Sequence, residues 1–126
     1  MILLDTNFIV TYLTGYNQNG ELDKVKRVIN SGLNMFIPWV VLHELTMVLT
    51  KYLKLERTEV EKRIIGLIQH QNFQILGSDK ALLISVFDIW VSTNLDFTDC
   101  FLLAKSYETG WMVASLDKEL LALQSK

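Results

Sequence analysis

Four carboxylate side chains occupy the positions in this chain that are best suited to chemistry. Each follows a short apolar run or lies near the start of a helical pattern, and they are Asp5, Glu44, Asp99 and Asp117. Hard divalent cations prefer oxygen ligands, usually a few carboxylates with water completing the coordination. A cation held in this way can lower the pKa of a bound water and polarise a phosphodiester. We therefore predict a site for Mg2+ or Mn2+ that hydrolyses phosphodiesters.

Each of these acids also has an ordinary structural role open to it. Asp5 and Asp117 are favoured types for helix caps, and Glu44 is typical of a solvated helix face. Asp96 lies three residues before Asp99 and could cap the same helix, add a fifth metal ligand or be an exposed loop acid, of which we favour the structural role. Only the four acids taken together favour a metal site.

The elements that must position these acids alternate between strands and helices. Short apolar runs predict strands at 2–4, 35–37, 73–76 and 111–114, with helical patterns between them. Such alternation predicts an α/β fold with a parallel sheet of four to five strands and helices on both faces. The carboxyl ends of parallel strands meet at one edge of the sheet, so acids far apart in the sequence can converge there.

Two predictions concern side chains around the site. The helix after Pro38 should bury an apolar stripe, with Glu44 at its boundary, and Thr98 should cap the helix that carries Asp99. The stripe consists of Val41, Leu45, Val48, Leu49 and Tyr52. The three tryptophans lie within apolar runs, which favours core packing over base stacking for Trp39, Trp90 and Trp111.

Composition narrows the class of protein. The 126 residues, half of them apolar, are expected to form a single domain over residues 1–126. A net charge of −2 is not the footprint of a protein that coats nucleic acid, so any such contact must be local or metal-assisted. The single Cys100 excludes an internal disulfide and a thiolate zinc site. Without a basic leader or a long apolar run, we expect a soluble cytoplasmic protein with no membrane contact.

A mixed surface lies between two of the predicted helices. Acidic residues are interleaved there with the cations Lys51, Lys54, Arg57, Lys62 and Arg63. A solvated, salt-bridged surface is the default interpretation. The alternative hypothesis is that some of these cations face a nucleic-acid backbone near the acidic site.

The order of four short motifs carries a resemblance to a known family. They are Asp5-Thr6-Asn7 after the first strand, Glu44-Leu45 on the helix after Pro38, Asp99-Cys100-Phe101 at a helix start, and Ser115-Leu116-Asp117 after the last strand. With these motifs in this order, residues 1–121 resemble the PIN-domain family, and most closely its VapC-type ribonuclease toxins from toxin–antitoxin pairs. The resemblance implies a three-layer PIN-like fold. A departure is Cys100, where relatives usually have a small alanine.

The resemblance also implies an activity and partners. Asp5, Glu44, Asp99 and Asp117 would hold Mg2+ or Mn2+, Asn7 and Ser115 would support them, and the substrate would be single-stranded or loop RNA. The chain would then be an endoribonuclease toxin, a homodimer, and the partner of a small antitoxin protein.

Other functions remain to be weighed against this one. The main alternative is a non-catalytic PIN-like interaction module whose acids serve as caps. An aspartyl phosphatase is disfavoured because no second aspartate follows Asp5 two positions later. A nucleotide-binding domain is weaker still, since no glycine-rich loop follows the first strand.

Overall fold

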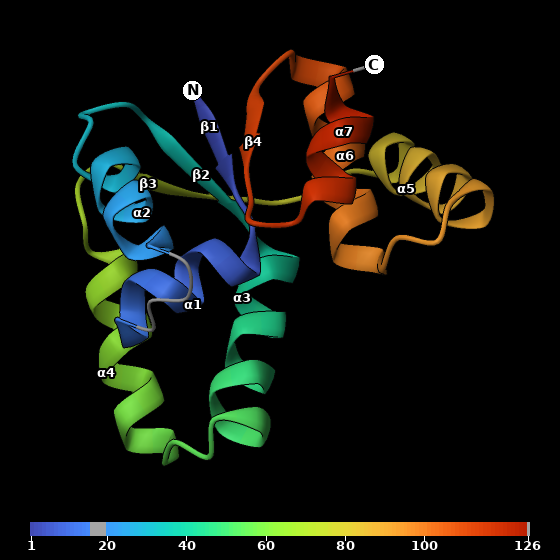
Figure 1. Ribbon diagram of the computed structural model, residues 1–126. Helices are drawn as coiled ribbons and strands as arrows, with labels where there is room; N and C mark the ends of the chain where they lie inside the picture. Colours follow the sequence, from blue (N-terminus) through green and yellow to red (C-terminus); the bar gives the residue numbers. More distant parts are fainter. Residues whose placement is uncertain (16–19, 126) are drawn as a thin grey trace.

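The protein is built on one parallel sheet. A computed structural model describes residues 1–15 and 20–125 (Figure 1). Within them the strand order is β3-β2-β1-β4, and every neighbouring pair is parallel. The sheet therefore has four strands, the lower of the two numbers predicted. The strands are β1 (Ile2–Leu4), β2 (Met35–Pro38), β3 (Phe73–Leu76) and β4 (Met112–Ala114).

Helices fill the connections between the strands, which confirms the predicted α/β class. The first crossover carries α1 (Thr6–Thr14) and α2 (Glu21–Ile29). The second carries α3 (Trp39–Met47), the π-helical turn η1 (Val48–Tyr52) and α4 (Arg57–Ile68). The third carries α5 (Lys80–Ser92) and α6 (Phe97–Thr109), and α7 (Lys118–Gln124) follows β4. In the described ranges, no helix combines the length and the apolar character that crossing a membrane requires.

The strand order creates a switch point beside β1. The chain steps from β1 to β2 to β3 in one direction and then returns to place β4 on the other side of β1. Because parallel crossovers are right-handed, this reversal puts α5 and α6 on the face opposite the earlier helices. Figure 1 shows the two groups on either side of the sheet. Open α/β sheets bind ligands outside the carboxyl ends of the strands at such a point, here between β1 and β4.

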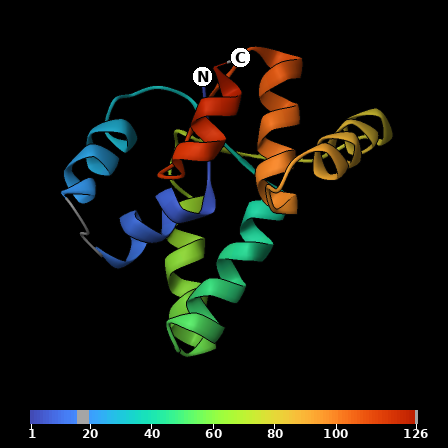
Figure 2. The ribbon, with the colours of Figure 1, turned by 45° about the vertical axis from the view of Figure 1, so that its right-hand side comes forward.

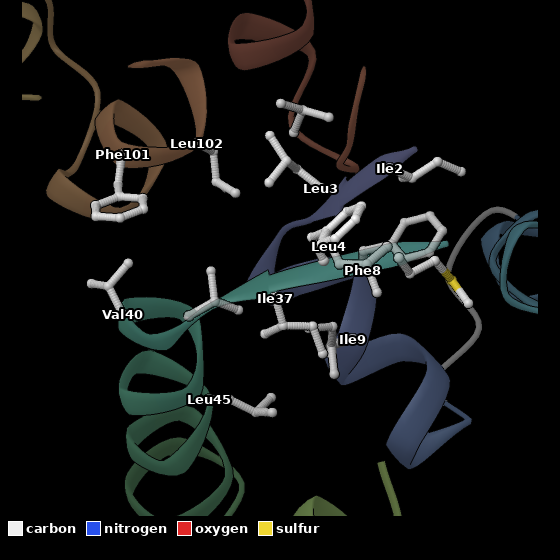
Figure 3. Packing of buried hydrophobic residues seen from close by; sticks show 14 of the residues in the cluster. Ile2, Leu3, Leu4, Phe8, Ile9, Ile37, Val40, Leu45, Phe101 and Leu102 are labelled. Carbon is white, nitrogen blue, oxygen red and sulfur yellow. The ribbon is translucent and has the colours of Figure 1, made fainter. Parts of the chain in front are cut away.

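The core covers β1 and β2 on both faces. Leu3, Leu4 and Ile37 are completely buried, and Figure 3 shows Phe8 of α1 and Leu45 of α3 among the side chains packed around them. Burying one such side chain stabilises the fold by about 1.5–3 kcal/mol. The chain leaves β1 inside this covered layer, so the residue that follows the strand begins its helix out of water.

The second crossover extends away from the sheet as two antiparallel helices, α3 and α4, joined through η1 (Figures 1 and 2). The predicted stripe is confirmed where α3 and the start of η1 lie against the core, because Val41, Leu45 and Leu49 are buried. It is wrong at its end, since Tyr52 is 78 % exposed. The helix continues beyond the sheet there, and the π-helical turn changes the direction of the last side chains.

The predicted burial of the tryptophans is confirmed only in part. Trp111 is partly buried and stacks on Phe36, with ring centroids 4.3 Å apart. Trp39 and Trp90 are exposed instead. Trp39 lies in the first turn of α3, where its Nε1 donates to Ser78 Oγ, and Trp90 lies on the outer side of α5. An apolar run on a peripheral helix contains residues on both sides of that helix, and the core covers only one.

Candidate metal centre

Asp5 ends β1 and caps α1 with a buried carboxylate. One oxygen, Oδ1, accepts a hydrogen bond from the Thr6 backbone N–H at 2.7 Å, and Oδ2 accepts from Ser115 Oγ at 2.5 Å. Burial raises the pKa of Asp5 to about 6, because it outweighs the lowering by these two bonds, and the charges of Glu44 and Asp96 raise it further. The side chain is only 3 % exposed. The two hydrogen bonds therefore fix the orientation of the carboxylate, and burial makes its ionisation unfavourable.

Ser115 joins Asp5 to a second predicted acid. Its Oγ donates to Asp5 and accepts from the backbone N–H of Asp117 at 3.0 Å. Asp117 in turn caps α7, where its Oδ1 accepts from Glu119 N at 2.9 Å. Asn7 adds a second link, since its Oδ1 accepts from Leu116 N at 3.1 Å. Both residues predicted to support the site thus bond across the switch point.

Asp99 lies in the first turn of α6 and is 8 % exposed. The helix is capped by Asp96, whose Oδ1 accepts from the Asp99 N–H at 2.9 Å, so the predicted cap at Thr98 is wrong. Asp96 has the extended backbone that a cap requires, whereas Thr98 is already helical. Burial raises the pKa of Asp99 to about 8, followed by the charges of the nearby carboxylates, which are those of Asp5, Asp96, Asp117 and Glu44.

Glu44 lies on α3 where two grooves meet. The Asn7 groove, about 450 Å3, is lined by Glu44 together with Thr6, Asn7, Glu21 and Leu116, among others. The second, about 510 Å3, runs from Glu44 to Tyr52 and includes Phe97, and we name it the Tyr52 groove. The carboxylate of Glu44 is thus placed between the switch point and the projecting helices.

Three polar residues of the Asn7 groove were not predicted as site residues, and they are Thr6, Thr11 and Glu21. Glu21 begins α2 and faces the same groove as Glu44. No strand ends before Glu21, so the sequence carries no signal for it. Thr6 follows Asp5, and its buried Oγ1 has no hydrogen-bond partner among the residues that the structure describes. From the sequence, a threonine at this position suggests only helix capping. The unpaired hydroxyl is visible only in the folded structure.

The donor set fits a hard cation whose coordination is completed by water. No group of three or more acidic, histidine or cysteine side chains within the described ranges is close enough to hold a metal ion. Mg2+, however, is usually bound through one or two carboxylates, with water and substrate phosphates filling the other positions. Asp5 and Asp99 are buried acids with raised pKa values, and a neighbouring cation would favour their ionised forms. The four acids form an electrostatic cluster, and no three of them form a closed ligand cage.

Comparison with known proteins agrees with this geometry. The PIN domain family model matches residues 2–125. The chain belongs to the PIN-domain family. This PIN domain has the fold of VapC20 of Mycobacterium tuberculosis, a sarcin–ricin loop cleaving toxin, with a TM-score of 0.76, 16 % identity, and coverage of 97 % of this chain and 94 % of that one.

Two further solved structures show the same fold. A toxin–antitoxin complex from Klebsiella pneumoniae matches this PIN domain with a TM-score of 0.71 and 15 % identity, over 97 % of this chain and 91 % of that one. FitAcB from Neisseria gonorrhoeae matches with a TM-score of 0.70 and 20 % identity, over 99 % and 94 %. A search of curated protein sequences finds no match. The predicted PIN-like architecture is confirmed.

The raised pKa of Asp99 predicts a gain in stability when its charge is removed. A carboxyl whose folded-state pKa is near 8 opposes folding when ionised, fully above pH 8 and progressively less as the pH falls towards 3.8. Asp99→Asn should raise the free energy of unfolding at pH 8, without divalent ions, by on the order of 3 kcal/mol. Urea unfolding at pH 8 and pH 4 measures this, and the gain should nearly vanish at the lower pH. Equal stability of the two proteins at pH 8 would contradict the assignment.

Proposed function

We propose that this PIN domain is a metal-dependent endoribonuclease and the toxin of a VapBC-type toxin–antitoxin pair. The observation that carries the proposal is the pair of buried carboxylates, Asp5 and Asp99, with other acids around them at the switch point of the sheet. Ionised carboxylates that are buried close together disfavour folding. Their position at the ligand-binding edge of the sheet therefore favours a bound cation that compensates their charge. The structural likeness to VapC20, a sarcin–ricin loop cleaving toxin, supports RNA as the substrate.

The proposed roles follow from the place of each acid in the fold. Asp5, Asp99 and Asp117 would contact the ion, and Glu44 would complete the site or orient water. Mg2+ or Mn2+ would supply an activated water and neutralise phosphate charge. Thr6 N–H and the Ser115 hydroxyl fix the orientation of the Asp5 carboxylate. Asp99 holds a proton at neutral pH without metal because its pKa is near 8.

The proposed partners rest on structural relatives and on an exposed helix. Solved relatives include a toxin–antitoxin complex and FitAB bound to a DNA fragment, which supports a small antitoxin partner for this chain. The outer face of α5 exposes Ile84, Phe87 and Val91, which repeat at helical spacing. We propose that this apolar face contributes to a homodimer.

A growth assay and an RNA cleavage assay together test the proposed nuclease activity. The chain should arrest growth when expressed without an antitoxin, and the purified protein should cleave cellular RNA with Mn2+ or Mg2+ but not with EDTA. Cleavage that persists in EDTA would overturn metal dependence. A complete absence of cleavage in both ions would overturn the nuclease.

One alternative function is also supported by a structural observation. Asp5 and Asp117 both accept capping hydrogen bonds, and the described residues contain no closed metal cage, as expected for a PIN-like interaction module without catalysis. Calorimetry separates the two functions. Binding of Mn2+ together with RNA cleavage favours the nuclease, whereas an absence of Mn2+ binding favours the module.

A further inference from the structure

The Tyr52 groove connects the candidate metal centre with the exposed tip of the projecting helices. Glu44 lies in both grooves, while Tyr52 and Phe97 come from η1 and from the start of α6. Figures 1 and 2 both show the first turn of α6 beside the beginning of α3. Asp99 lies two residues after Phe97 on that same turn. The groove therefore lies between the helices that carry two of the predicted metal ligands.

The π-helical turn accounts for the presence of Tyr52 in this groove. A regular α-helix completes a turn in 3.6 residues, so side chains spaced by four drift steadily around the axis. The i→i+5 bond from Leu53 N to Val48 O, 3.0 Å long, adds a residue to that turn and reduces the drift. Tyr52 consequently lines the same groove as Glu44 and Val48. Single π turns of this kind occur frequently at functional sites.

The residues that line the Tyr52 groove favour a flat, uncharged ligand. Besides Tyr52, the lining contains the Phe97 ring, the His43 imidazole and the aliphatic side chains Val40 and Met47. Among the lining residues that the structure describes, Glu44 is the only carboxylate and there is no lysine or arginine. A phosphate group would therefore find no lysine or arginine partner among these lining residues. Its volume, about 510 Å3, lies in the range of about 300–1,000 Å3 typical of small-ligand sites.

One wall of the groove is held in place and the other is open. Phe97 packs edge-on against Phe87 of α5, with ring centroids 5.3 Å apart and an interplanar angle of 63°. Tyr52 is exposed. Lys51 and Lys54 lie close to it in the chain and outside the groove, and Lys51 lines the neighbouring cavity between η1 and α4. Exposed aromatic rings beside cations are the combination that binds single-stranded nucleic acid, through base stacking and backbone attraction. Cations outside the groove and rings inside it match a nucleotide whose base enters while its phosphate remains in solvent.

We propose that the Tyr52 groove binds an unstacked base of single-stranded RNA, near the phosphate that is cleaved, with Tyr52 as the stacking residue. The inference rests on the proposed nuclease function and adds a binding site for a neighbouring nucleotide. Glu44 and Tyr52 are eight residues apart, which is about 12 Å along a helix. Tyr52 therefore lies too far away to touch the reacting atoms, and it acts through binding.

Kinetics of Tyr52 variants on one RNA that the wild type cleaves test this site. Tyr52→Ala should raise KM by roughly 5- to 150-fold, the usual effect of removing a base-stacking ring, with kcat nearly unchanged. Tyr52→Phe and Tyr52→Trp should retain the wild-type KM, whereas Tyr52→Leu should behave like Ala. Tyr107→Ala is the matched control, because Tyr107 is an exposed tyrosine on α6 outside the groove, and its KM should not change.

Abasic substitutions in the same RNA locate the base. Removing one base at a time should reveal a position near the cleavage site where KM rises for the wild type and does not rise further for Tyr52→Ala. Independent, additive effects at every position would overturn the proposal. Equal KM for Tyr52→Leu and Tyr52→Phe would also overturn it, because the groove would then accept any apolar group, such as a protein side chain.

If Tyr52→Ala cleaves like the wild type, this inference fails and the nuclease stands. If the wild type cleaves no RNA, the proposed function fails first.

Discussion

Asp5→Asn should reduce metal-dependent RNA cleavage by at least about 1,000-fold while the protein remains folded. The loss follows from removing a charged ligand from the proposed metal centre, whose ion would contribute several kcal/mol to the transition state, and each 1.36 kcal/mol changes the rate tenfold. The fold should tolerate the change because asparagine keeps the oxygen that accepts from the Thr6 N–H. Its amide can donate to Ser115 Oγ in place of accepting from it. Removing a buried charge also favours folding.

Circular dichroism and single-turnover cleavage with Mn2+ measure the two halves of this expectation. Asp88→Asn provides the matched control, since Asp88 is an exposed aspartate on α5 and lies outside the candidate centre. That variant should cleave RNA at the wild-type rate. Full activity of Asp5→Asn would remove the catalytic assignment, and an unfolded variant would shift the role of Asp5 to structure alone.

The affinity for Mn2+ should rise by about 100-fold between pH 6 and pH 8. Protons compete with the ion for the carboxylates, and raising the pH removes them. Asp99, with a pKa near 8, is protonated over most of this range, whereas Asp5, with a pKa near 6, is mostly ionised at pH 7. Binding at pH 7 should therefore release about one proton per ion.

Calorimetry in two buffers of different ionisation enthalpy counts the released protons. Asp99→Asn provides the comparison, because it removes the group that titrates near pH 8. In this variant the proton release at pH 7 should fall close to zero, and the affinity should become nearly independent of pH above 7. An unchanged proton count would mean that Asp99 does not contact or sense the ion.

The parts of the fold that the sequence predicts best are those with one dominant physical cause. The uninterrupted apolar run Ile2–Leu4 ends at Asp5, and a strand buried on both faces is the simplest structure with that pattern. The same holds for the strand that ends at Pro38. Because both strands are parallel and adjacent, the acids that follow them have to emerge at one edge.

Other features depend on tertiary context that no local pattern contains. The exposure of Tyr52 depends on the π-helical turn and on where α3 extends beyond the sheet. Thr98 and Asp96 are both good caps, and only the backbone conformation of Asp96 decides between them. Glu21 enters the Asn7 groove because α1 packs against both α2 and α3, and this helix packing is not visible in the local sequence.

The hydrogen bond between Ser115 and Asp5 joins residues 110 positions apart, and it orders events during protein synthesis. At about 5–20 residues per second, a ribosome takes roughly 5–20 s to add the second partner after the first. During that interval the carboxylate lacks its hydroxyl donor, and the edge of β1 that β4 will occupy lies open. The Asp5–Ser115 hydrogen bond and the pairing of β1 with β4 can therefore form only after Ser115 has been added to the chain.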